Sequence, residues 1–138
     1  MNPEIIPALI FVIISIIGLA KRHREIFLLG YFLYGILVFG AEISSFISTQ
    51  EPINLFVAFI WLIQAVLAFP NKYPYDSPSV KDARIKICIA LSLINTTGVL
   101  IPEISPEPQI TLYIHLIMAI LPLMVVGLLS SGKIEMEK

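Results

Sequence analysis

Five apolar blocks alternate with short polar stretches along the chain. The blocks predict helices at residues 3–20, 26–49, 53–69, 79–101 and 109–131. An α-helix needs about 17–25 predominantly apolar residues to cross the hydrocarbon core of a bilayer. The first, third and fourth apolar runs are near the lower limit of that range. The pattern therefore predicts an all-α protein: a single transmembrane domain, residues 1–138, built as an integral membrane bundle of five transmembrane helices.

The charged residues predict how this bundle is oriented. If five spans alternate, every basic residue falls on one side of the membrane, and the other side carries only acidic residues. The basic side holds Lys21, Arg22, Arg24, Lys72, Lys81, Arg84, Lys86, Lys133 and Lys138, and the acidic side holds Glu4, Glu51, Glu103 and Glu107. Loops rich in Lys and Arg stay in the cytoplasm, so the N-terminus is predicted outside and the C-terminus inside. The first block also has its basic residues after it, as a first transmembrane helix does, whereas a signal peptide has them before it.

Composition agrees with a membrane protein and excludes several other classes. Hydrophobic residues make up 57 % of the chain and charged residues 14 %, whereas a soluble domain averages about 45–50 % apolar residues. A net charge of −1 provides no basic face for nucleic acid. The single cysteine, Cys88, excludes an intramolecular disulfide and a multi-cysteine metal site. We expect no cofactor and no metal. The expected partners are the lipid bilayer and other membrane subunits or further copies of the chain, in the cytoplasmic membrane of a prokaryote.

Glu42 is the most informative residue, because it places a carboxylate inside the second apolar block. A charge within a membrane segment costs roughly 3 kcal/mol on insertion scales, so a partner or a proton must offset it. At about 1.5 Å per residue, Glu42, Asn95 and His115 each lie roughly 9–10 Å from the outer ends of their helices, and Gln64 lies at about 16 Å. We hypothesise that Glu42, Asn95 and His115 form one hydrogen-bonded cluster, with Gln64 as a deeper polar residue.

Each of these residues has a structural interpretation beside a functional one. Glu42 is either a protonated or paired structural group, or a carboxylate that handles a proton, a cation or a substrate. His115 is either a structural histidine that bonds to a neighbouring helix, or a proton relay or ligand. Asn95 and Gln64 are most simply hydrogen-bonding groups between helices. Pro122 interrupts the fifth helix and is a candidate hinge.

Motifs that would indicate an enzyme are absent, including H-E-x-x-H, a Gly-rich phosphate loop and G-x-S-x-G. The short loops leave no extramembrane domain for catalysis, so no catalytic residue is assigned. The predicted function is a small structural or accessory subunit of a membrane complex. The alternative is a small oligomeric transporter or channel that uses the intramembrane polar residues Glu42 and His115. An intramembrane enzyme, or a haem or quinone protein, is the third interpretation.

Overall fold

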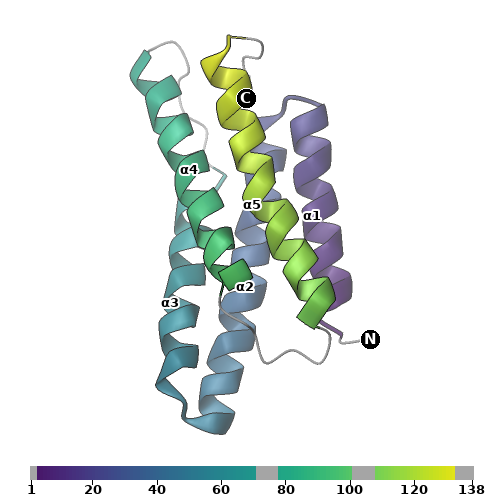
Figure 1. Cartoon of the computed structure of the whole chain (residues 1–138), viewed down its shortest axis with the longest axis vertical. Helices are drawn as coiled ribbons and strands as arrows, with labels where there is room; N and C mark the ends of the chain where they lie inside the picture. Colours follow the sequence, from purple (N-terminus) through teal and green to yellow (C-terminus); the bar gives the residue numbers. More distant parts are fainter. Residues whose placement is uncertain (1–2, 71–77, 101–107, 133–138) are drawn as a thin grey trace.

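The computed structural model describes residues 3–70, 78–100 and 108–132, and these contain five α-helices and no strand. The helices are α1 (Ile5–Ala20), α2 (Arg24–Thr49), α3 (Pro52–Leu67), α4 (Pro78–Leu100) and α5 (Pro108–Ser130). Their directions alternate along the chain (Figure 1). The predicted all-α class is confirmed, and each helix begins and ends within two residues of the predicted bound. Lys72, Glu103, Glu107, Lys133 and Lys138 lie outside the described residues.

Three of the five helices are long and apolar enough to cross a membrane. These are α2, the Lys81–Leu100 part of α4 and the Gln109–Ser130 part of α5. The other two, α1 and α3, are apolar but have 16 residues each. At 1.5 Å per residue, each is about 24 Å long, which is shorter than an average hydrocarbon core of about 30 Å.

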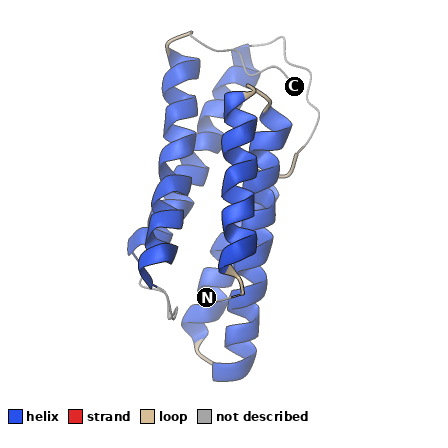
Figure 2. Ribbon diagram, turned by 90° about the vertical axis from the view of Figure 1, so that its right-hand side faces the viewer, coloured by secondary structure: helices blue, strands red, loops and turns tan. Residues whose placement is uncertain are grey.

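The helices form a ring in chain order. Each helix packs against the next one in the chain, and α5 closes the ring against α1. The packing is most extensive within α1–α2–α3, here called the three-helix unit, and within α4–α5, here called the hairpin unit. The units meet less extensively, where α1 faces α5 and α3 faces α4. Figures 1 and 2 show the ring from two sides.

Glycines allow the helices of the three-helix unit to approach closely. A Cβ atom on Gly18 of α1 would lie 2.6 Å from the Cα of Phe27 of α2. A Cβ atom on Gly30 of α2 would lie 2.5 Å from the carbonyl oxygen of Phe11 of α1. On the other side of α2, one on Gly35 would lie 3.0 Å from a backbone oxygen of α3. Small residues are typical of such close contacts between membrane helices.

The two ends of the ring carry opposite charges. The basic end holds the six Lys and Arg residues of the described chain, which lie where α1 ends and where α2 and α4 begin (Lys21, Arg22, Arg24, Lys81, Arg84 and Lys86). At the opposite end, Glu4 and Glu51 precede α1 and α3. We call this second end the acidic end. The helix sides between the two ends expose large apolar residues, as lipid-facing surfaces do.

Candidate functional site: a pocket at the acidic end

A pocket of about 300 Å³ lies between the helices at the acidic end, and all five helices contribute residues to its wall. We call it the Glu42 pocket. Its polar lining residues are Glu4, Tyr34, Glu42, Ser45, Thr49, Asn54, Trp61, Thr97 and Thr111. The rest of the described lining is glycine, alanine and aliphatic residues, and none of it is Lys, Arg or His. The wall is therefore mixed polar and apolar, and its only formal charges are negative.

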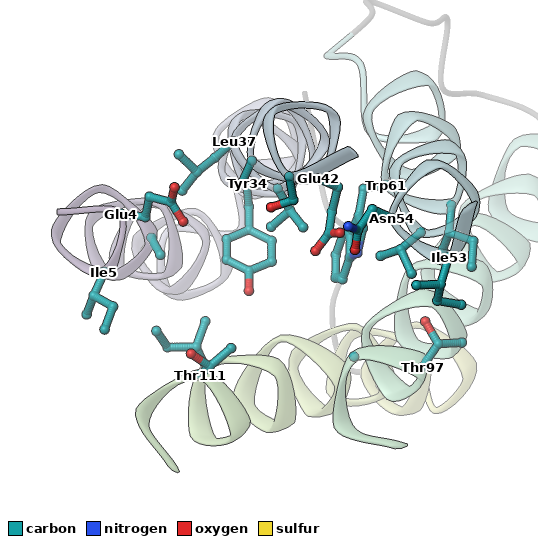
Figure 3. A pocket seen from close by; sticks show the side chains of 18 of the residues that line it. Glu4, Ile5, Tyr34, Leu37, Glu42, Ile53, Asn54, Trp61, Thr97 and Thr111 are labelled. Atoms are coloured by element: carbon teal, nitrogen blue, oxygen red, sulfur yellow. The ribbon is translucent and has the colours of Figure 1, made fainter. Parts of the chain in front are cut away.

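The α2 face that lines the pocket follows from helical periodicity. Residues 34, 38, 42, 45 and 49 recur at intervals of three or four and so share one side of the helix. Figure 3 shows Tyr34 and Glu42 of α2 beside Trp61 of α3, across the pocket from Thr97 and Thr111. Glu42 is only partly buried. The membrane-embedded carboxylate predicted from sequence thus faces a cavity and not a sealed core.

Two aromatic residues of the lining, Tyr34 and Trp61, form the floor of the pocket, and the ring of His115 packs directly behind them. The Tyr34 hydroxyl lies 3.1 Å from His115 Nδ1. The Trp61 and His115 rings stack with centroids 5.2 Å apart, and Tyr34 meets Trp61 edge-on at 5.5 Å. No more than 2 % of any of the three side chains is exposed. A Cβ atom on Gly98 would lie 2.7 Å from His115 Nδ1, so the glycine leaves room for the imidazole.

A second buried polar group lies beside this floor. Asn95 Nδ2 donates to Gln64 Oε1 at 2.7 Å and to the Leu91 carbonyl at 2.8 Å. Gln64 Nε2 donates to the Tyr31 carbonyl at 3.1 Å. Neither amide side chain is exposed, and Asn95 Oδ1 accepts no hydrogen bond from the described residues. These bonds join α2, α3 and α4.

Pro122 lies inside α5, where it lacks the N–H that would bond to the carbonyl of Met118 four residues earlier. The Tyr31 hydroxyl of α2 donates to that carbonyl at 2.6 Å. Ser92 of α4 donates to the next carbonyl, that of Ala119, at 2.7 Å. Two neighbouring helices therefore bind the backbone at the proline. Pro122 is a fixed contact point in this conformation, and its role as a hinge stays a prediction.

The sequence-predicted residues fall into two neighbouring sets. Glu42 lines the pocket, and His115 lies behind its floor, against Tyr34 and Trp61. Asn95 pairs with Gln64, although axial depth alone separates the two by roughly 6 Å. Long side chains on tilted helices span such an offset.

Tyr34, which lines the pocket and contacts His115, was not among the residues predicted from the sequence. Its spacing was the available signal, because Tyr34 lies eight residues before Glu42 and so shares its helix face. The described residues contain no group of three or more His, Cys, Asp or Glu side chains that could hold a metal ion.

Comparison with protein family models, curated proteins and solved structures finds no match to this chain. The function is therefore argued from the pocket itself.

Proposed function

We propose that all five helices cross the cytoplasmic membrane of a prokaryote, with the N-terminus outside. The support is the separation of charge, because the basic end matches the cytoplasmic side of a membrane protein. The short helices α1 and α3 are accommodated by local thinning of the bilayer, at a modest cost per ångström of mismatch. In this orientation the Glu42 pocket opens toward the outside.

We further propose that the protein is a small transporter and that the Glu42 pocket binds its solute. The observation that carries this proposal is a cavity of about 300 Å³ that reaches a partly buried carboxylate inside an apolar helix. Small-molecule sites begin at about this volume and combine apolar walls with a few polar groups. Ionisable residues within membrane bundles that face a water-filled cavity mark substrate and ion pathways.

The division into two units provides a way to alternate access. The pocket wall comes from both units, with Thr97 and Thr111 contributed by the hairpin unit. Transporters commonly rock one helical unit against another around a fixed binding site. Hydrogen bonds between described residues connect the units beneath the pocket, among them Tyr31 to Met118, Tyr34 to His115, and Asn95 to Gln64. We propose that these hydrogen bonds close the path from the pocket to the cytoplasmic side. When that path opens, the same groups form hydrogen bonds to water instead.

Thiol accessibility tests this proposal without knowledge of the solute. In a Cys88→Ala background, Ala41→Cys places the only thiol in the pocket wall. The variant is reconstituted in liposomes, and a membrane-impermeant maleimide is added on one side at a time. A transporter is expected to be labelled from the outside, and more slowly from the inside. Gly40→Cys is the control, because this neighbour is exposed and nothing surrounds it within 4 Å.

Labelling from the outside alone would contradict alternating access, and labelling from neither side would contradict an aqueous pocket. The Gly40→Cys thiol should resist labelling from both sides, because a thiol in lipid does not form the reactive thiolate.

An accessory-subunit role is the second candidate, and a stripe on α3 favours it. Phe56, Phe59, Ile63 and Val66 are 54–69 % exposed and recur at helical spacing on one side of α3. Such a surface contacts either lipid or another membrane helix. Extraction from the native membrane in mild detergent, followed by native mass spectrometry, tests this role. A subunit would retain a stoichiometric partner, and Phe56→Ala with Phe59→Ala would release it.

A further inference from the structure

We propose that the Glu42 pocket selects a small organic cation, an amine or quaternary ammonium with an apolar body. This inference rests on the proposed function of the pocket as a solute site, and it adds the class of solute. It follows from the charge of the lining, from the apolar part of the wall, and from the distribution of charge over the whole bundle.

The pocket favours positive charge over negative charge. Two carboxylates line it, Glu42 and Glu4, and the described lining contains no basic side chain to oppose them. The six Lys and Arg residues of the described chain all lie at the other end of the bundle. A cleft that is lined by one sign of charge, with low-dielectric walls, concentrates ions of the opposite sign.

The apolar wall favours an organic cation over a metal ion. Ca²⁺ takes six to eight oxygen ligands, and Mg²⁺ keeps several of its waters, whereas the described residues contain no group of three or more His, Cys, Asp or Glu side chains that could hold a metal ion. More of the pocket wall is aliphatic than acidic, including Val38 of α2 and Ile60 of α3. Burying an apolar group against such a wall stabilises the complex, because apolar surface is removed from water. A hydrated metal ion gains nothing from that surface.

The floor agrees with this choice. Tyr34 and Trp61 line the end of the pocket that lies toward the basic end. The faces of such rings carry negative partial charge and attract ammonium groups. An ammonium head beside Glu42 therefore meets a carboxylate on one side and aromatic groups below it, and its apolar body fills the aliphatic part of the wall.

Trp61 provides the readout, because it is the only tryptophan in the chain and lines the pocket. Purified full-length protein in nanodiscs is titrated with three probes that share a benzyl group: benzyltrimethylammonium, benzyl alcohol and phenylmethanesulfonate. We expect the cation to change Trp61 fluorescence at a concentration at least about tenfold below that of either other probe. The titrations are repeated with Glu42→Gln, which preserves shape and removes the charge, and with Glu51→Gln as the control. Glu51 is an exposed carboxylate at the same end that does not line the pocket.

The outcomes separate this inference from the proposed function. The inference is supported if Glu42→Gln weakens binding of the cation at least about tenfold, equivalent to about 1.4 kcal/mol, while Glu51→Gln leaves it within about twofold. Equal binding of the three probes to the natural protein overturns the inference but leaves a solute pocket in place. Tighter binding of the neutral or anionic probe does the same. If no probe changes the fluorescence at any concentration, the inference and the solute pocket both fail. The comparison of probes on the natural protein decides the inference even if Glu42→Gln does not fold.

Discussion

The hydrogen bond from Tyr31 to the Met118 carbonyl gives the sharpest quantitative prediction. Pro122 cannot supply the N–H that this carbonyl would receive in a regular helix, and the Tyr31 hydroxyl replaces it at 2.6 Å. Both residues are fully buried. Tyr31→Phe therefore leaves a buried carbonyl without its donor while preserving the ring, so the substitution isolates the hydrogen bond from the packing.

The expected loss is about 1–2 kcal/mol in the free energy of unfolding. An unsatisfied buried acceptor costs about 1–3 kcal/mol, and hydrogen bonds between membrane helices have averaged about 0.6 kcal/mol, with a maximum near 1.7. Pro122→Ala restores an N–H four residues after Met118. In that background, Tyr31→Phe should cost less than about 0.5 kcal/mol, which gives a coupling energy near 1 kcal/mol between positions 31 and 122.

Unfolding by sodium dodecyl sulfate in mixed micelles, followed by far-ultraviolet circular dichroism, measures all four members of this cycle. Tyr113→Phe is the matched control: Tyr113 is also on a helix but is 61 % exposed, so we expect a change within about 0.5 kcal/mol. Strictly additive losses for Tyr31→Phe and Pro122→Ala would refute the argument that the hydroxyl replaces the missing backbone bond.

Two further predictions concern helix packing and the buried amides. Gly18→Ala should destabilise the protein by about 1–3 kcal/mol or prevent folding, because the new Cβ atom would overlap the backbone of Phe27. Gly127→Ala is the control, because nothing lies within 4 Å of a Cβ atom at this position. In the same assay Gly127→Ala should be neutral or stabilise the protein by up to about 1 kcal/mol. Gln64→Leu should cost about 1–3 kcal/mol because it removes the acceptor for Asn95, and Asn95→Leu in addition should recover part of that loss. These assignments would be contradicted if Gly18→Ala and Gly127→Ala were equally stable. They would also be contradicted if the double leucine variant lost more stability than the two single leucine variants lose together.

The sequence was enough to predict the all-α class and the helix bounds, because both depend on local signals. Runs of apolar residues, the turn at Thr49–Pro52 and the basic residues around Lys21 each act within a few residues of the chain. The charge pattern likewise identified the two ends of the bundle before the helices were placed in space.

The partners of the buried polar residues could not be predicted in the same way, because they depend on how each helix is rotated. Asn95 bonds to Gln64, and His115 lies against Tyr34 and Trp61. A contact of either residue with Glu42 stays a prediction. Depth follows from counting residues along one helix. Rotation is set by tight contacts such as Gly98 against His115, which involve residues from two helices at once.

The same reason explains why the pocket itself was beyond prediction. Its wall combines residues from all five helices, including Thr97 of α4 and Thr111 of α5. Neither threonine has a distinctive sequence context. The carboxylate drew attention to the correct helix, but the cavity depends on how the hairpin unit sits against the three-helix unit.

The proposed transport cycle requires the three-helix unit and the hairpin unit to move against each other around the Glu42 pocket. Pulsed electron–electron resonance distances measure this directly, with spin labels at Ser48→Cys of α2 and Gln109→Cys of α5 in the Cys88→Ala background. Both positions are exposed, belong to different units and lie at the acidic end. A second pair, Lys21→Cys with Ser48→Cys, lies within the three-helix unit and is the control. We expect two distance populations for the first pair in nanodiscs and one for the control. A single narrow distance for the first pair, with or without a bound solute, would contradict the account.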